Sequence, residues 1–402
     1  VLDWHTRLDG QVKNPSLAMQ CIGNLGMAYW MMGNAEKAIT YYQKALDMTR
    51  AQKHREGEGV WLGNLGSAYL NLGEIERAIG YYEDALVIAR EIKDRKGEGN
   101  RLGNLGLAYA DLGEIERAIG YYEDALVINR EAKDKRSEGN QLGNLGSAYL
   151  NLGEIERAIG YYNDALVIAR EIKDKRSEGI DLGNLGIAYR NLGEIERAIG
   201  YYEDALVIAR EIKDRKGEGI RLGNLGSAKT LLGRYAEAIP HLHESIEIVT
   251  AINAPHLIQD KNAALATAYW YAGSLTDALA TIRQARTYDI IANNHAVAGL
   301  HGCIALCAGH ADEAKRAFEE ALTHADALLA KTANQYGALY SRGLALAGLW
   351  MVTGDADYRA RATSAYADAM AVNRGAGVLL ENRQKLEAVA RCAGADVVGW
   401  LG

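Results

Sequence analysis

The chain has 402 residues, with 52 acidic against 45 basic side chains and a formal net charge of -7. This charge excludes the sequence-independent attraction to phosphate on which nucleic-acid binders depend, and no local basic patch is evident, so we expect no nucleic acid partner. The longest apolar run, at residues 344–352, is far shorter than the roughly twenty residues that a membrane helix needs, and no membrane partner is expected either.

The four cysteines are Cys21, Cys303, Cys307 and Cys392. They are too few and too scattered for a disulfide framework, which favours a reducing compartment. The first residue is Val1, and no charged-then-apolar leader follows it. We therefore expect a cytoplasmic chain, and we interpret the missing initiator methionine as a sign that this sequence is excised from a larger protein.

Residues 1–16 form a polar lead-in, in which Asn14, Pro15 and Ser16 predict a turn and a helix start. A forty-residue pattern follows, LGNLGSAYLNLGEIERAIGYYNDALVIAREIKD in its clearest form. A period in this range is typical of a solenoid, in which each unit buries its apolar face against its neighbours. Copies begin at Ile22 in degenerate form and then at Leu62, Leu102, Leu142, Leu182 and Leu222.

Each copy predicts two helices. The apolar face of the first recurs at three- and four-residue intervals, and Gly73 is expected to end it as a left-handed cap before Glu74 opens the second. A connector at residues 93–99 would then turn the chain back. The predicted apolar positions are Leu62, Leu65, Ala68, Tyr69 and Leu72 in the first helix, and Ile75, Ala78, Ile79, Tyr82, Ala85, Leu86 and Ile88 in the second.

Two glycines lie inside each first helix, where glycine costs roughly 1 kcal/mol against alanine. Gly66 sits among the apolar residues, so we assign it to close helix packing. Gly63 is expected to expose backbone to a ligand.

Beyond residue 233 the copies decay, but Gly273, Gly309 and Gly354 continue the phase. We expect six regular units over residues 17–258, three degenerate units over residues 259–375, and a capping helix with a tail over residues 376–402.

The pattern LGNLGSAYLNLGEIERAIGYYEDAL resembles the tetratricopeptide repeat, with Gly66, Tyr69, Gly73, Ala78 and Tyr82 at that family's signature spacings. The resemblance implies an all-α superhelix of about nine helical hairpins plus the capping helix. It also implies a binding module that performs no chemistry. The predicted helices are longer than those of the common form of this repeat. In this respect they are similar to the helices of spindle-orientation adaptors and of the sensor arrays of bacterial STAND-type NTPases.

Three constellations suggest chemistry, and each has a simpler reading. Residues 223–230 approach a phosphate-binding loop, but Ala228 replaces its glycine inside a repeat helix. His301, Cys303, Cys307 and His310 could bind zinc, although cysteines in an alanine-rich helix usually act as small apolar residues. Paired acids such as Glu74 and Glu76 recur in four units, unlike an active site, and indicate solvated surface. We expect no enzyme, no cofactor and no metal.

The differences between copies fall mainly on the first helix. Residues 60, 64, 67 and 71 form one stripe of that helix, and in the family that the sequence resembles the first helices line a concave groove. We therefore expect this stripe to face a ligand; neutral drift on an exposed surface is the alternative. The varied positions include Trp61, Arg101, Gln141 and Asp181 in one series, Leu107 and Ile187 in a second, and Asp111 and Arg190 in two others.

One residue of the stripe does not vary. The resemblance implies that its amides hold the backbone of an extended peptide, while the alternative is that each amide ties one repeat to the next. Aromatic and arginine side chains near the stripe are typical of binding hot spots. The invariant amides are Asn24, Asn64, Asn104, Asn144, Asn184 and Asn224, and the additional expected contacts are Trp30, Arg221, Trp270 and Tyr271.

These observations predict a module that binds a protein or an extended peptide in its groove. The leading hypothesis is the ligand-sensing array of a larger signalling protein, with an upstream domain in the parent chain. A freestanding scaffold is the alternative, and a metal-binding protein is the third reading.

Overall fold

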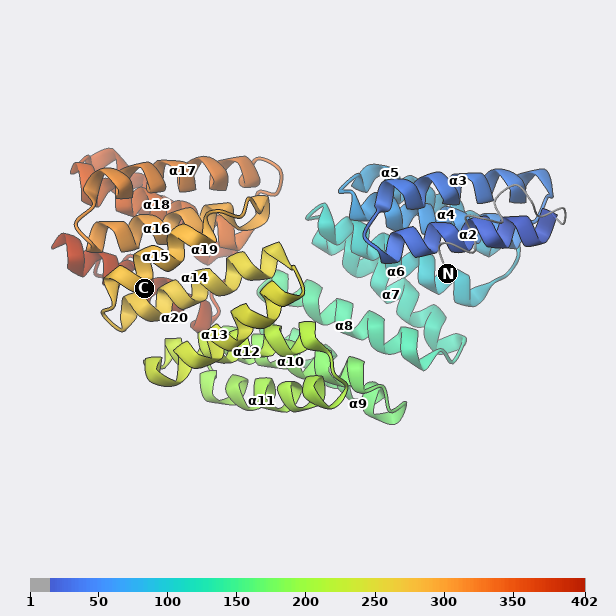
Figure 1. Cartoon of the computed structure of the whole chain (residues 1–402), viewed down its shortest axis with the longest axis horizontal. Helices are drawn as coiled ribbons and strands as arrows, with labels where there is room; N and C mark the ends of the chain where they lie inside the picture. Colours follow the sequence, from blue (N-terminus) through green and yellow to red (C-terminus); the bar gives the residue numbers. More distant parts are fainter. Residues whose placement is uncertain (1–14, 402) are drawn as a thin grey trace. The chain divides into compact units, whose positions relative to one another are not determined.

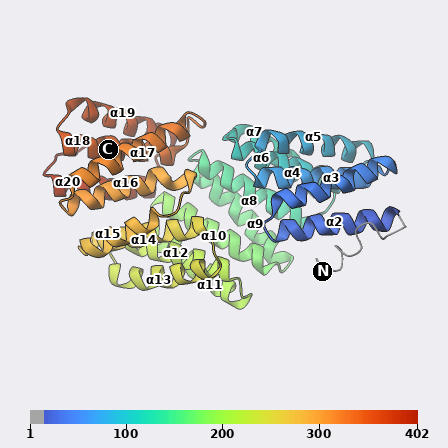
Figure 2. The ribbon, with the colours of Figure 1, turned by 45° about the horizontal axis from the view of Figure 1, so that its top comes forward.

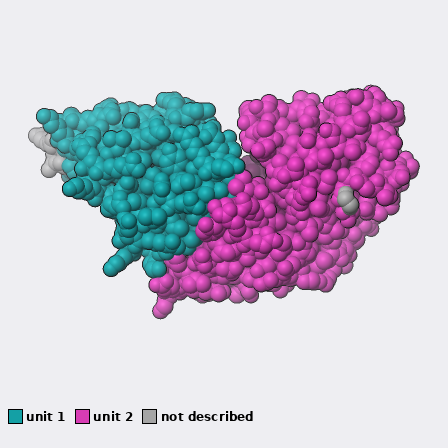
Figure 3. Space-filling view, turned by 180° about the vertical axis from the view of Figure 1, so that it is seen from behind, with its two compact units in different colours: residues 1–148 teal, residues 149–402 magenta. Residues whose placement is uncertain are grey.

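The computed structural model describes residues 15–401, so the first fourteen residues of the expected lead-in lie outside the described part. Within it, 19 helices follow one another and no strand occurs (Figures 1 and 2). They form nine antiparallel hairpins and one further helix, which confirms the predicted all-α solenoid. The chain divides into two compact units, residues 1–148 and residues 149–402 (Figure 3).

The first unit contains regular hairpins whose helices are each seventeen residues long. Its helices are α2 (Pro15–Met31), α3 (Ala35–Ala51), α4 (Arg55–Asn71), α5 (Ile75–Glu91), α6 (Arg95–Asp111), α7 (Ile115–Glu131) and most of α8 (Lys135–Asn151).

The second unit continues the regular hairpins and then the degenerate ones. Its helices are α9 (Ile155–Glu171), α10 (Lys175–Leu192), α11 (Ile195–Glu211), α12 (Arg215–Leu231), α13 (Tyr235–Ala251), α14 (Pro255–Tyr271), α15 (Leu275–Ala285), α16 (Ile291–Cys307), α17 (Ala311–Leu329), α18 (Tyr336–Thr353), α19 (Ala356–Val372) and α20 (Ala376–Ala393).

The turn inside each hairpin follows from its glycine. Gly73 has a φ of 77°, in the left-handed region that favours glycine, as predicted. Leu72 departs from the prediction: it is 42% exposed, because it caps the helix rather than continuing its apolar face.

The turn between hairpins is shorter than the expected connector. Lys93 has a φ of 58° and reverses the chain by itself, so that α6 already begins at Arg95. Asp94 caps the new helix by accepting a hydrogen bond from the Gly97 amide. Glu98 is therefore not in a loop but buried in the first turn of α6, where it accepts hydrogen bonds from Arg90 at 2.9 Å and Arg95 at 2.6 Å.

In most of the regular hairpins the core is built around a close contact between a glycine and a tyrosine. A methyl group on Gly66 would lie 2.6 Å from the Tyr82 ring, so glycine is needed for this close approach, as predicted. The same pairing recurs between Gly106 and Tyr122, and in a degenerate unit between Gly302 and Phe318.

The first helices of consecutive hairpins also pack on one another, α4 on α6 and α10 on α12. The C-terminal helix α20 packs on α16 and α18, and its Leu386 belongs to the same apolar cluster as Tyr366 of α19. It also contacts α10, far earlier in the chain. Helix α20 is thus more than a cap, because it lies along the first helices of several hairpins.

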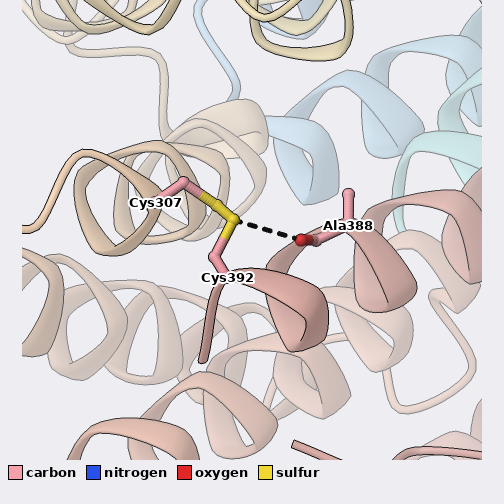
Figure 4. Close-up of a disulfide and its surroundings, with 3 residues drawn as sticks. All are labelled: Cys307, Ala388 and Cys392. Carbon is pink, nitrogen blue, oxygen red and sulfur yellow. Dashed lines mark hydrogen bonds between the residues drawn. A yellow bond between two sulfur atoms is a disulfide. The ribbon is translucent and has the colours of Figure 1, made fainter. Parts of the chain in front are cut away.

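The cysteines depart from the expectation of a reducing compartment, in which disulfides are rare. Cys307, at the end of α16, forms a disulfide with Cys392 of α20 across a sequence separation of 85 residues (Figure 4). The carbonyl oxygen of Ala388 lies 3.3 Å from the Cys392 sulfur. Scattered positions in the sequence gave no sign of this pair, because only the return of α20 brings the two sulfurs together.

Candidate functional site

The expected stripe is solvent-accessible in the first unit. On α6, Asn104 is half-buried, Leu107 is 41% exposed and Asp111 is exposed, while Trp30 at the end of α2 is 42% exposed. These positions lie on first helices, as the sequence predicts. Asn24 is exposed, and Asn64, Asn104, Asn144, Asn184 and Asn224 are half-buried on α4, α6, α8, α10 and α12.

The amides of this ladder are largely free within the described residues. The Asn144 amide donates a long hydrogen bond of 3.4 Å to Gln141 of its own helix. No side-chain hydrogen bond of Asn64, Asn104, Asn184 or Asn224 is present in the part of the chain that the structure describes. The reading in which each amide ties one repeat to the next therefore has no hydrogen bond behind it.

One of the varied series lies between helices rather than on the open stripe. A methyl group on Gly63 would lie 2.4 Å from the Arg101 guanidinium, and this guanidinium donates to the Gly59 carbonyl oxygen at 3.4 Å. Gly63 thus makes room for the side chain of the next repeat and does not expose backbone to a ligand. The same arrangement places Trp61 over Gly23, Gln141 over Gly103, Arg221 over Gly183 and Lys261 over Gly223.

Asp181 belongs to this inter-helix series and is 6% exposed. Burial, followed by the repulsion of Asp174, raises the pKa of its carboxyl to about 7. Trp270 is also placed differently from the expectation: it is 5% exposed and packs in the core of the second unit. Its neighbour Tyr271 is half-buried, and its buried hydroxyl has no hydrogen-bond partner among residues 15–401.

In the second unit the stripe is covered by another segment of the chain. A methyl group on Gly377 would overlap the backbone of Arg190, and one on Gly375 would lie 2.6 Å from the Asn191 carbonyl oxygen. The Gln384 amide donates to the carbonyl oxygen of Leu231 at 3.1 Å. Residues 373–390 therefore run over the first helices α10 and α12.

The covered stripe encloses a cavity of about 300 Å³ within the second unit. The first helices α10, α12, α14, α16 and α18 and the C-terminal helix α20 all contribute to its wall. Two of the ligand contacts expected from the sequence, Arg190 and Tyr271, line this cavity.

The histidines and cysteines of the eighth hairpin, which the sequence suggested as possible zinc ligands, make other contacts. His301 contacts Glu313 at 2.8 Å and Arg286 at 2.6 Å, Cys303 is fully buried, and Cys307 is in the disulfide. Among residues 15–401, no three histidine, cysteine or acidic side chains converge as a metal site. The loop-like motif at residues 223–230 is continuous helix inside α12, where Lys229 pairs with Glu237.

The comparisons identify the class of repeat. The tetratricopeptide repeat model matches residues 16–91, 57–131 and 137–211, so these residues are tetratricopeptide repeats. No curated protein matches the sequence. Within the described helices, none is long and apolar enough to cross a membrane.

Solved structures share the fold at low sequence identity. A STAND protein with a tetratricopeptide repeat sensor from Pyrococcus horikoshii is 21% identical, with a TM-score of 0.56 over 70% of this chain and 43% of that chain. Aspartyl phosphate phosphatase F from Bacillus subtilis is 17% identical, with a TM-score of 0.56 over 67% and 70%. A Rap protein complexed with competence and sporulation factor is 13% identical, with a TM-score of 0.56 over 82% and 98%. The chain thus shares its fold with these proteins, and the tetratricopeptide repeat fold is typically a scaffold for binding proteins and peptides.

Proposed function

We propose that the first unit binds an extended segment of a partner protein along the stripe of its first helices. The observation that carries this proposal is the second unit, where the chain seats its own residues 373–390 on the equivalent stripe. Beneath this segment Asn191 is only 4% exposed. The equivalent residues of the first unit, Asn71 on α4 and Asp111 on α6, are exposed. A surface that accepts a polypeptide in one unit is repeated, without that cover, in the other.

The free amides suit an extended backbone. Each asparagine offers one acceptor and two donor hydrogens, so a ladder of them pairs with backbone C=O and N–H groups whatever the partner's side chains are. Leu107 beside the ladder adds apolar area, and Asp111 adds a negative charge at the end of α6. Selectivity would come from these varied neighbours.

The wider setting that we propose is the sensor array of a larger signalling protein. The likeness in fold to a STAND protein with a tetratricopeptide repeat sensor supports this setting. So does the likeness to a Rap protein that was solved with competence and sporulation factor. Sequencing the parent gene tests it, because a nucleotide-binding domain upstream of this chain is expected and an open reading frame without one would contradict the proposal.

The binding itself is tested with a displayed library of random extended peptides. The chain is expected to enrich peptides, and replacing Asn64, Asn104 and Asn144 together by alanine should weaken every enriched peptide by about tenfold or more, since several backbone hydrogen bonds are lost. Helicity and melting temperature should stay nearly unchanged because the amides are partly exposed. The matched control is a variant in which Glu83, Asp84 and Glu123, on the exposed sides of α5 and α7, are replaced together by alanine. This variant should bind the enriched peptides as the natural chain does.

Two results would contradict the proposal. Unchanged peptide affinity in the asparagine variant would mean that the ladder does not contact the ligand. A large loss of melting temperature in that variant, absent from the control, would mean that the amides are structural.

A further inference from the structure

The cavity beneath α20 has polar and apolar walls in one small space. Leu231, Val297, Leu300 and Leu344 provide apolar surface, while Arg190 and the hydroxyl-bearing Tyr271 provide polar groups. A cavity of about 300 Å³ is at the lower end of the range for small-molecule sites. Its size and lining therefore suit a small molecule with an apolar body and few polar groups.

One cation in the cavity wall makes no hydrogen bond within the described residues. Of its four charged side chains, Glu381 and Lys385 pair with each other at 2.7 Å, and Asp260 pairs with Lys261 at 2.7 Å. Arg190 has no hydrogen bond and no ion pair within the described residues. Glu381 and Asp260 attract the Arg190 guanidinium electrostatically, but no acceptor in the described structure lies within hydrogen-bonding distance of it. A half-buried guanidinium with unfilled donors is costly unless a ligand supplies an acceptor.

A second group in the wall also lacks a partner. The Tyr271 hydroxyl is buried and has no hydrogen bond in the described structure. It belongs to α14, whereas Arg190 belongs to α10, and the two side chains line the same cavity. A ligand that reaches both would satisfy two polar groups that the fold leaves open.

Arg190 is not required by the repeat. The equivalent position is Leu70, Ala110 or Leu150 in the other near-identical copies, which form the same hairpin. The arginine thus occurs in only one of the repeats whose first helices α20 covers, since the equivalent residue of α12 is Thr230. The hairpin itself therefore forms without this arginine.

The number and sign of the charges define the anion. Arg190 balances one negative charge, and its planar fork matches a carboxylate through two parallel hydrogen bonds. A phosphate monoester would bring nearly two negative charges close to Asp260 and Glu381, which would repel it. We infer that the cavity beneath α20 is a binding site for a small organic monocarboxylate with an apolar body, held by Arg190 and Tyr271.

The carboxylate could come from a free acid or from the end of a peptide, and the probes distinguish these sources. Calorimetric titration of the full chain would use 4-methylpentanoate and phenylacetate as free acids and acetyl-leucine as a chain end. The neutral amides of the two free acids and phenyl phosphate are the comparisons. Saturable binding of at least one carboxylate is expected, with its amide and phenyl phosphate binding at least tenfold more weakly.

Variants assign the binding to the cavity. Arg190→Leu installs the residue of two other repeats, so the fold should be kept, and the carboxylate should bind about 10- to 100-fold more weakly because charge-assisted hydrogen bonds are lost. Tyr271→Phe should weaken it about threefold or more. Arg176→Leu removes an exposed arginine from the same helix and should have no effect.

The inference is overturned if none of the three carboxylates binds, if Arg190→Leu binds them as the natural chain does, or if phenyl phosphate binds more tightly than phenylacetate. It does not rest on the proposed peptide function. The asparagine replacements in the first unit should leave carboxylate binding unchanged.

Discussion

Replacing Asp181 by asparagine tests how the first helices pack. The carboxyl is 6% exposed, and no ion pair involving it occurs within the described residues. Its pKa of about 7 in the fold compares with about 3.9 in an unfolded chain, a difference that corresponds to about 4 kcal/mol as an upper bound. Relaxation and water penetration reduce such values, so we expect Asp181→Asn to stabilise the chain by about 1–3 kcal/mol at pH 8.

The sign of the pH dependence follows from the raised pKa. Below about pH 4 both states are protonated and the carboxyl costs nothing; between pH 4 and 7 the unfolded state loses its proton first, so folding stability falls as pH rises. Urea unfolding followed by circular dichroism at pH 4.5 and pH 8 should therefore show a large gain only at pH 8. Asp204→Asn, on an exposed side of α11, is the control. An equal gain at both pH values, or a loss at pH 8, would refute the reasoning.

Two further predictions concern the hairpin core and the C-terminal helix. Gly66→Ala should destabilise the fold by about 1–3 kcal/mol because the new methyl group meets the Tyr82 ring. Gly80→Ala, whose methyl group meets nothing within 4 Å, should stabilise the fold by about 0.5–1 kcal/mol. The midpoints of urea unfolding compare the two variants, and equal effects would contradict the packing role of Gly66. Replacing Cys307 and Cys392 by serine should lower stability by about 2–4 kcal/mol and speed hydrogen exchange of α20 relative to α6; unchanged exchange of α20 would mean that the disulfide does not hold this helix.

Much of the hairpin fold could be predicted because its causes are local. Leu65 and Tyr82 recur at helical spacing, and the left-handed Gly73 ends the first helix within a few residues of the groups it positions. The role of Gly66 was also predictable, because a glycine among apolar helix residues usually marks a close approach. Each of these features depends on residues of the same repeat.

The features that could not be predicted depend on neighbours outside the repeat. Lys93 in a left-handed turn carries no glycine signal, so the start of α6 and the burial of Glu98 were missed. Variation at Arg101 suggested a ligand surface, but the residue packs over Gly63 of the preceding repeat. Copies of the repeat can differ at a position because it is exposed to solvent, or because it packs against a neighbouring helix. The sequence alone does not distinguish these two causes.

The return of α20 was the largest unpredicted feature, and it changes how the stripe must be read. Asn71 and Asn191 occupy the same place in near-identical hairpins, yet the first is exposed and the second is buried. No residue of the repeat itself accounts for this difference; residues 373–390 do, because they cover α10. A substitution at Arg190 therefore alters a cavity wall, whereas one at Ala110 alters an open surface. Substitutions at equivalent positions of two repeats therefore test different proposals: small-molecule binding in the second unit and partner binding in the first.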